Sequence, residues 1–325
     1  MPFTLQRPAT LHEALQLLSG DARARPVAGG TDLLVNLRHG IGDTPTLVDL
    51  GELAELQACT IAADGDEVAT LGAGLTLAWI AGDAALARAL PLLAEAAKTI
   101  AGPAHRTVAT LGGNLCLDTR CVYYNQSAWW RSANAHCLKY RGEVCHVAPQ
   151  GQHCHAAFSG DLAPALLVLG ATATVAGPGG ARRIALGDLY REDGARPLTL
   201  EAGEIVVAVQ VPAQPSGARS GYRKARARGA MDFPLAGVAM RLCMDGERVG
   251  ELRVALTGTN ARPFLLEGVD ALHGRALDDA ALAQLAKLVQ KQVTPVRTTV
   301  TGADYRRQVA GVLAQRLASD LAGRQ

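Results

Sequence analysis

Short apolar runs alternate with amphipathic segments at the start of the chain. Apolar residues at helical spacing over 11–18 predict a helix, whereas the runs at 3–5, 25–28 and 46–50 are short enough for strands. A second helix is predicted over 33–38, directly after a pair of glycines. This N-terminal stretch therefore predicts a small unit in which strands and helices alternate.

The middle of the chain mixes strand and helix patterns and ends in a linker. Further strands are predicted at 68–73, 172–176, 183–186 and 205–211, and helices at 75–80, from Pro91 onward and at 162–169. Proline and glycine between Pro212 and Gly217 end regular structure there. We therefore expect one domain over 1–215, with subdomains at about 1–56 and 57–215, and a second domain over 216–325.

The C-terminal part predicts a hairpin followed by two long helices. Strands at 236–244 and 251–257 join through Asp245-Gly246, a residue pair that favours tight hairpins. Helices are predicted at 279–293 and 303–321, and the arginines of the second are expected to face solvent. Together these patterns predict an α+β fold with a small antiparallel sheet in its C-terminal part.

Charge and composition exclude several classes of partner. The chain carries 32 basic and 30 acidic side chains without a basic block, which argues against nucleic acid and membrane surfaces as partners. No apolar run is long enough to span a membrane and residues 1–4 lack the regions of a signal peptide, so we expect a cytoplasmic protein with reduced thiols. Cys59 and Cys243 stand alone among apolar residues and are expected to be buried hydrophobic side chains.

The unusual chemistry of the chain gathers between Thr110 and Asp161. This stretch holds five of the seven cysteines, four of the eight histidines and six of the thirteen aromatic residues. Four of the cysteines follow the spacing Cys121-x15-Cys137-x7-Cys145-x8-Cys154, which contains neither the paired CxxC of zinc sites nor the CxxCxxC of bacterial ferredoxins. Spacing alone leaves three interpretations open: an iron–sulfur cluster, a zinc site that includes the neighbouring histidines 136, 146, 153 or 155, or plain packing.

Two glycine turns offer a second kind of site. Gly29-Gly30 stands between a predicted strand and a helix, where bare backbone N–H groups and the helix N-terminus suit an anion. Asp32 would repel a phosphate and is interpreted as a helix cap or a contact to a sugar hydroxyl. The GxGxxG dinucleotide fingerprint is absent. Two adjacent glycines are by themselves a weak signal.

Together these motifs resemble a known family. Gly29-Gly30-Thr31-Asp32, then Thr110-Leu111-Gly112-Gly113-Asn114-Leu115, and then Tyr222 and Lys224 ahead of Arg228, are similar to the FAD-binding medium subunits of the xanthine oxidase, or molybdenum hydroxylase, family. The resemblance covers almost the whole chain and implies a two-subdomain FAD-binding domain of the PCMH type, followed by a domain like the C-terminal domain of the CO dehydrogenase flavoprotein. It implies FAD contacts from Ala28, Gly29, Gly30, Thr31, Asp32, Leu33, Thr110, Gly112, Gly113, Asn114, Cys116, Asp161 and Lys224.

The cysteine-rich insert, residues 117–158, adds a narrower resemblance. Most members of the family pass directly from the Gly-Gly-Asn turn to a segment like Ser159–Pro164, whereas the insert and its run Asp118–Ser127 resemble 4-hydroxybenzoyl-CoA reductase β subunits. That resemblance implies a [4Fe–4S] cluster with Cys121, Cys137, Cys145 and Cys154 as ligands and leaves Cys116 in the flavin turn.

The resemblance also implies a role. The chain would be an electron-transfer subunit without catalytic residues of its own, relaying electrons from a ferredoxin-like donor toward a molybdopterin subunit that removes the phenolic hydroxyl of 4-hydroxybenzoyl-CoA in anaerobic aromatic degradation. Its expected partners are that large subunit and a small [2Fe–2S] subunit, in a dimer of heterotrimers. Two alternatives remain: the FAD subunit of a molybdenum hydroxylase that runs oxidatively, and a zinc-stabilised binding or assembly module.

Overall fold

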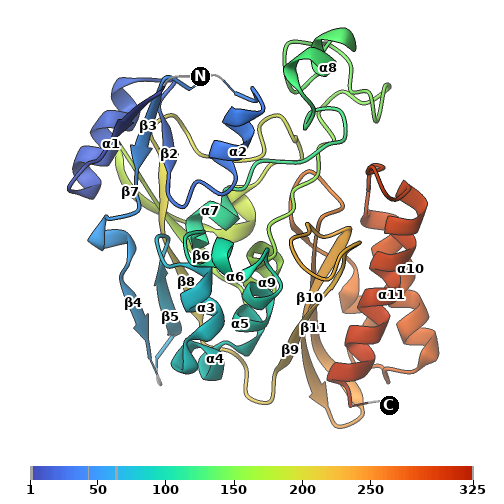
Figure 1. Ribbon diagram of the computed structural model, residues 1–325. Coiled ribbons are helices and arrows are strands. Elements are labelled where there is room, and N and C mark those ends of the chain that lie inside the picture. Colours follow the sequence, from blue (N-terminus) through green and yellow to red (C-terminus); the bar gives the residue numbers. More distant parts are fainter. Residues whose placement is uncertain (1–2, 43, 63–64, 324–325) are drawn as a thin grey trace.

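The computed structural model describes residues 3–42, 44–62 and 65–323, and within them the strands form three sheets (Figure 1). The strands are β1 (Thr4–Gln6), β2 (Arg25–Val27), β3 (Thr46–Asp49), β4 (Cys59–Ile61), β5 (Glu67–Gly72), β6 (Thr172–Gly177), β7 (Gly180–Ala185), β8 (Ile205–Pro212), β9 (Arg219–Ala225), β10 (Ala236–Asp245), β11 (Arg248–Thr257) and β12 (Phe264–Leu265). The helices are α1 (Leu11–Gly20), α2 (Leu33–Arg38), α3 (Leu77–Gly82), α4 (Ala84–Ala89), α5 (Pro91–Lys98), α6 (Pro103–Arg106), α7 (Leu111–Leu115), α8 (Ala128–Ala133), α9 (Leu162–Val168), α10 (Asp279–Gln292) and α11 (Ala303–Leu321), with the 3-10 helices η1 (Ala54–Leu56), η2 (Leu186–Leu189) and η3 (Val269–Leu272).

The N-terminal unit has the predicted alternation of strands and helices. Its three strands are parallel in the order β1-β3-β2. Thr10 caps α1 because its side chain accepts a hydrogen bond from the Glu13 N–H, and Ala14 and Leu18 bury the apolar face of the helix. Helix α2 begins and ends at the predicted residues 33 and 38. The chain therefore leaves β2 through Gly29-Gly30 directly into a helix.

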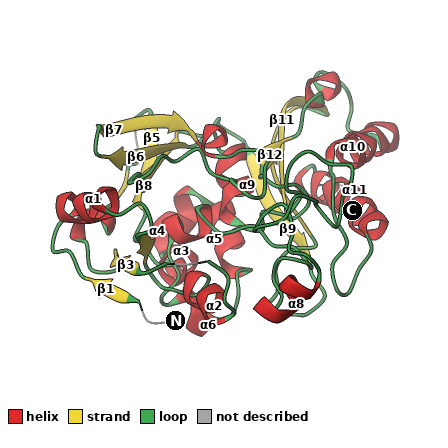
Figure 2. Ribbon diagram, turned by 90° about the horizontal axis from the view of Figure 1, so that it is seen from above, coloured by secondary structure: helices red, strands yellow, loops and turns green. Residues whose placement is uncertain are grey.

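The middle of the fold is an antiparallel sheet covered by helices. Its strand order is β4-β5-β8-β6-β7, and Figure 2 shows α3, α5 and α9 beside it. Every residue of α9 is buried because the helix contacts α5 and α7 on one side and β10 and β11 on the other. Helix α9 thus lies where the middle sheet and the C-terminal sheet meet, at the centre of the main hydrophobic core.

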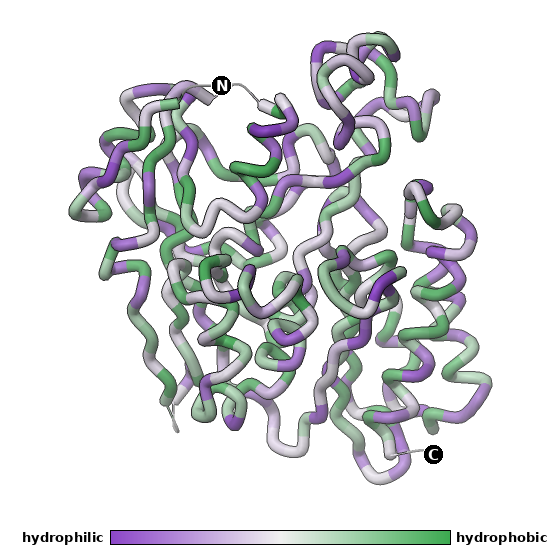
Figure 3. Tube along the Cα trace, in the orientation of Figure 1, coloured by the Kyte–Doolittle hydropathy of each residue, from purple (hydrophilic) through white to green (hydrophobic). Residues whose placement is uncertain are grey.

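The C-terminal sheet has the order β12-β11-β10-β9; α11 packs against β10 and β9, and α10 packs against α11. The predicted hairpin is β10–β11, and the alternation of hydrophobic and hydrophilic residues can be followed along the two helices in Figure 3. Strand β9 escaped prediction because its sequence, RSGYRKA, is dominated by polar residues. It lies at the edge of the sheet, where charged side chains are common and where two residues, Gly221 and Tyr222, are buried.

Three expectations about burial need correction. Arg306 does not face solvent: the residue is 3% exposed, and its guanidinium donates to the backbone carbonyls of Leu235, Val296 and Gly258. An arginine has five N–H donors, so one side chain can satisfy all three of these backbone carbonyls. Burial lowers the pKa of Arg306 to about 10. Cys59 and Cys243 are half-buried rather than buried: Cys59 begins the partly exposed strand β4, and Cys243 follows the continuously buried residues 236–242 near the end of β10.

The insert has little regular structure and stands out from the body at the top of Figure 1. Its ends meet in an antiparallel bridge, in which Arg120 and Ala157 exchange two backbone hydrogen bonds of 2.8 Å. Helix α8 is the regular element within its described residues, and its Arg131 donates to the Gly40 carbonyl at 2.6 Å. None of the helices in the described parts of the chain is both long and apolar enough to cross a membrane.

Candidate functional site

Two glycine turns from distant parts of the sequence face each other across one cavity. Gly29 lies so close to the chain at Val108 that a Cβ atom would stand 2.1 Å from the Val108 carbonyl oxygen. Gly112, at the start of α7, lies against Ala73, whose Cβ would be 2.9 Å from an added Cβ. Gly30 has a φ of 68°, which favours glycine. The glycines therefore let four backbone segments approach, and a cavity of about 910 Å³ opens beside them.

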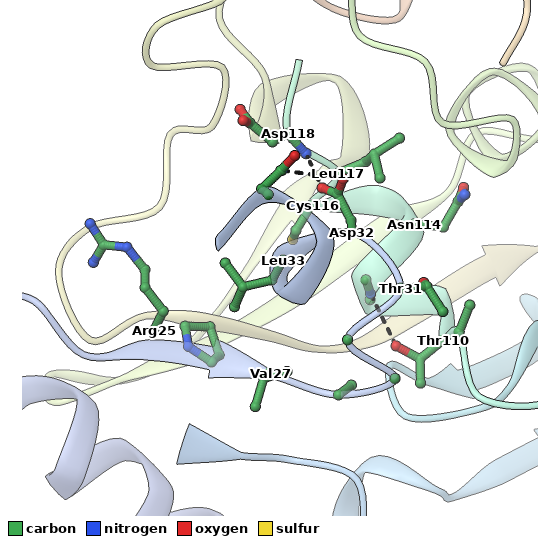
Figure 4. A pocket seen from close by; sticks show the side chains of 18 of the residues that line it. Arg25, Val27, Thr31, Asp32, Leu33, Thr110, Asn114, Cys116, Leu117 and Asp118 are labelled. Atoms are coloured by element: carbon green, nitrogen blue, oxygen red, sulfur yellow. Dashed lines mark hydrogen bonds between the residues drawn. The ribbon is translucent and has the colours of Figure 1, made fainter. Parts of the chain in front are cut away.

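This glycine-lined cavity collects nearly all residues expected to contact FAD. Lys224 is not among its lining residues, whereas the other twelve are. These twelve are Ala28, Gly29, Gly30, Thr31, Asp32, Leu33, Thr110, Gly112, Gly113, Asn114, Cys116 and Asp161. Figure 4 shows the Thr110 hydroxyl accepting from the Gly113 N–H at 3.1 Å, which caps α7. Asn114 accepts from the Leu162 N–H at 3.1 Å and so ties this turn to α9.

Lys224 reaches the cavity through Asp161. Its ammonium donates to Asp161 Oδ2 at 3.1 Å, and the Tyr222 hydroxyl donates to Asp161 Oδ1 at 2.5 Å. The side chains of the ion pair are only 2% and 4% exposed. Burial raises the pKa of the Asp161 carboxyl, while the Lys224 ammonium and the Tyr222 hydroxyl act against that rise. Strand β9 therefore supports Asp161, which lines the cavity, while no residue of β9 is among the lining residues.

Asp32 does something different from the predicted helix cap. It occupies the position before α2, but its side chain caps no N–H of that helix. Its carboxylate instead accepts from the Arg120 guanidinium and from the Asp118 N–H at 3.2 Å, and Asp32 and Asp118 lie side by side in Figure 4. The Arg120 guanidinium also covers the Phe233 ring, 5.0 Å from its centroid. These contacts tie the Gly29-Gly30 turn to the N-terminal end of the insert.

Sequence reasoning missed several lining residues on loops. They are mainly polar or bulky side chains from the loops after η2 and after β9: Arg191, Arg196, Met231, Asp232 and Phe233. Nothing in their spacing distinguishes them from ordinary loop residues, since the fold brings them to the cavity from the far side. Tyr124, one of the six aromatic residues between Thr110 and Asp161, also lines this cavity.

The four predicted cysteine ligands line a second, smaller cavity, called here the cysteine cavity. Cys121, Cys137, Cys145 and Cys154 surround about 10 Å³ of free space, enough for the centre of roughly one water molecule. Burial raises the pKa of the Cys154 thiol to about 12, and the Lys139 ammonium works against that rise. Across the described residues, no three His, Cys, Asp or Glu side chains are arranged to hold a single metal ion.

Cys116 and most of the histidines lie outside the cysteine cavity. Cys116 lines the glycine-lined cavity, and burial raises the pKa of its thiol to about 12. His146 is the histidine that lines the cysteine cavity; it stacks on Tyr123 at 4.9 Å, and its Nε2 lies 2.5 Å from the His136 carbonyl oxygen. His153 and His155 stack on each other at 4.4 Å. This arrangement gives a mixed cysteine–histidine zinc site little support.

Two family models match this chain and together cover most of it. Residues 1–214 match the FAD binding domain in molybdopterin dehydrogenase, and residues 220–321 match the CO dehydrogenase flavoprotein C-terminal domain. The mixed α/β architecture described above is thus that of a known flavoprotein family.

Individual relatives agree with the family models. The FAD-binding subunit of aldehyde oxidoreductase from Escherichia coli is 33% identical over 83% of this chain and 85% of its own. The carbon monoxide dehydrogenase medium chain of Afipia carboxidovorans is 29% identical over 97% of this chain and 94% of its own. A crystal structure of a copper- and molybdenum-containing CO dehydrogenase superposes with a TM-score of 0.81 at 27% identity and covers both chains completely. None of these three names mentions an iron–sulfur cluster on the matching chain.

Proposed function

Because this chain belongs to the family of FAD-binding subunits of molybdopterin dehydrogenase-type oxidoreductases, we propose that the glycine-lined cavity is its FAD site. The supporting observation is the pair of glycine turns at one cavity of a size typical for cofactors, because glycine lets a bound group approach the backbone closely. FAD supplies the ability to accept and release electrons there. The Gly29-Gly30 turn and the helix after it would hold its pyrophosphate, and the Gly112-Gly113 turn would supply the other wall. Thr110, Asn114 and Asp161 would also line the site.

We further propose that the cysteine cavity holds a [4Fe–4S] cluster. A tetrahedral zinc site keeps each sulfur about 2.3 Å from the ion, which leaves no space for a water molecule among four thiolates. The four cysteines here line one cavity, yet no three potential ligands in the described chain converge on one ion. A four-iron cluster is larger and accepts thiolates that stand farther apart. The donor set also fits iron–sulfur chemistry, because four cysteines line the cavity and its one lining histidine, His146, directs its Nε2 to the His136 carbonyl.

With both cofactors, the chain would be the electron-transfer subunit of a 4-hydroxybenzoyl-CoA reductase. It would pass electrons from a ferredoxin-like donor to a molybdopterin subunit, with a small [2Fe–2S] subunit as the third partner in a dimer of heterotrimers. The similarity of the insert to the β subunits of such reductases supports this proposal. We keep 1–215 and 216–325 as the proposed domains, since the family models change between residues 214 and 220.

Metal analysis of cysteine variants tests the cluster. We expect anaerobically purified protein to contain iron and sulfide, and Cys145→Ser to lose both while it keeps its flavin. Cys59→Ser is the matched control, because Cys59 lies on β4, away from the cysteine cavity, and should change neither cofactor. Zinc without iron in the unaltered protein would favour the structural zinc module, and loss of flavin alone in Cys145→Ser would contradict the assignment of the cavity.

A second candidate function is the FAD subunit of a hydroxylase that runs oxidatively. It is favoured by the names of the relatives, which include dehydrogenases for carbon monoxide and xanthine. The two candidates differ in the direction of electron flow. A redox titration followed by EPR and absorbance separates them: a cluster potential below the flavin couples supports inward flow from a low-potential donor, and one well above them supports the oxidative direction.

A further inference from the structure

One aromatic side chain lines both of the proposed cofactor sites. Tyr124 lines both the glycine-lined cavity and the cysteine cavity, and it is only 8% exposed. The Lys139 ammonium lies over its ring, 4.4 Å from the ring centroid. Lys139 itself lines the cysteine cavity together with the four thiols. The wall between the sites therefore contains a buried positive charge on its cysteine side.

Lys139 is held in this wall by a complete set of acceptors. Its side chain is 5% exposed, and the ammonium donates to Asp118 Oδ1 at 2.7 Å, to Thr119 Oγ1 at 2.5 Å and to the Thr119 carbonyl at 3.1 Å. Lysine is rarely buried unless it is paired, so the surrounding chain is built to keep this charge in place. Asp118, its partner, lines the glycine-lined cavity and donates its own N–H to Asp32.

We propose that Lys139 is a positioning residue that raises the reduction potential of the iron–sulfur cluster, with Asp118 moderating its effect. This inference rests on the proposed function. A cluster held by four thiolates is negatively charged, and it gains one more negative charge when a reduced ferredoxin-like donor, or dithionite in vitro, delivers an electron. A cation fixed in a poorly solvated wall stabilises that added charge, whereas the Asp118 carboxylate on the far side opposes it.

This arrangement would also link the two sites. Asp118 touches the glycine-lined cavity and Lys139 touches the cysteine cavity, so their hydrogen bond joins the walls of both. A change of charge on the flavin side would reach the cluster through this pair. Such a link would help to bring the potentials of the two cofactors close together.

Redox titration of charge variants tests the proposal. In the purified full-length protein, Lys139→Gln should lower the midpoint potential of the cluster measured by EPR, Lys139→Arg should largely preserve it, and Asp118→Asn should raise it by a smaller amount. Lys287→Gln, at an exposed position on α10, is the matched control and should leave the potential unchanged. Flavin content is measured in every variant, because Asp118 lines the flavin side.

The opposite signs make the test decisive. If Lys139 only holds the loop together, Lys139→Gln lowers the iron content while the remaining cluster keeps its potential, and the proposal is overturned. If Lys139→Gln fails to assemble a cluster, Asp118→Asn still decides, since an unchanged or lower potential in that variant contradicts the proposal. Failure of the proposed function has a different signature, because the unaltered protein would then contain no iron and sulfide at all.

Discussion

The glycine-lined cavity and the cysteine cavity are built in opposite ways. The first is made by backbone turns from segments far apart in sequence, and each turn is packed against the body of the fold, as Gly29 is against Val108. The second is made by side chains within one stretch, 121–154, that has little regular structure. The comparison teaches that packing between distant segments shapes the first site, whereas the path of one irregular stretch of chain shapes the second.

The contacts that anchor the insert agree with this difference. They are concentrated at its stem, where Arg120 pairs with Ala157 through the backbone and the Thr119 hydroxyl donates to the Gly194 carbonyl at 2.5 Å. Phe158, at the C-terminal end of the insert, belongs to the main core. We therefore expect changes around the glycine-lined cavity to alter the stability of the whole fold, and changes within the insert to alter the insert alone.

The largest effect is expected for Lys224→Met. The substitution leaves the Asp161 carboxylate buried without its cation, and breaking a buried ion pair in this way costs about 3–5 kcal/mol. Chemical denaturation should show this loss in the free energy of unfolding, together with reduced flavin content. Arg223→Met is the control on the same strand, because the pair of Arg223 with Asp320 is about half exposed and should contribute at most about 1 kcal/mol. Equal losses of unfolding free energy in the two variants would contradict the idea that the buried pair of Lys224 with Asp161 stabilises the fold.

A smaller effect is expected for Gly29→Ala. The added Cβ would meet the Val108 carbonyl oxygen at 2.1 Å, and backbone cannot move aside as a side chain can. Overpacking of this kind costs about 1–3 kcal/mol, and the displaced turn should bind FAD poorly. Iron content should stay unchanged, because the cysteine cavity does not include this turn. Gly20→Ala, where an added Cβ meets nothing within 4 Å, should leave both cofactors in place.

Much of the fold can be predicted from the sequence, because most helices and strands have a clear local pattern of apolar residues. Helices α2 and α11 lie at their predicted residues, and the strands of the N-terminal unit and the hairpin deviate by one to three residues at their ends. Strand β9 was not predicted, because an edge strand with charged side chains lacks an alternating pattern of apolar residues. The prediction that Arg306 faces solvent was wrong. A helical arginine normally does so, but the carbonyls that Arg306 satisfies belong to loops whose paths no local pattern predicts.

The candidate site divides in the same way. Glycine pairs and clustered cysteines are visible in sequence because the residue types themselves are unusual, so the sequence indicates these residues of both cavities but not most of the others that line them. The sequence does not indicate the link between the two cavities. The sequence predicts Asp32 as a helix cap or a contact to a sugar hydroxyl, whereas its pairing with Arg120 joins residues far apart in the chain. Tyr124 and Lys139 carry no signal until the fold places them in a shared wall.

The smallest and most discriminating effect comes from two matched helix caps. Thr110 caps α7 in the glycine-lined cavity by accepting from Gly113 N at 3.1 Å, and Ser127 caps α8 in the insert by accepting from Trp130 N at 3.2 Å. Replacing such a cap by alanine removes about 1 kcal/mol from the helix. In Thr110→Ala the loss should appear in global unfolding, because α7 contacts α9 and the core. In Ser127→Ala it should appear only as faster hydrogen exchange within the insert, because that segment opens without unfolding the sheets. A global loss of equal size in Ser127→Ala would show that the insert is as much a part of the cooperative fold as the glycine turns are.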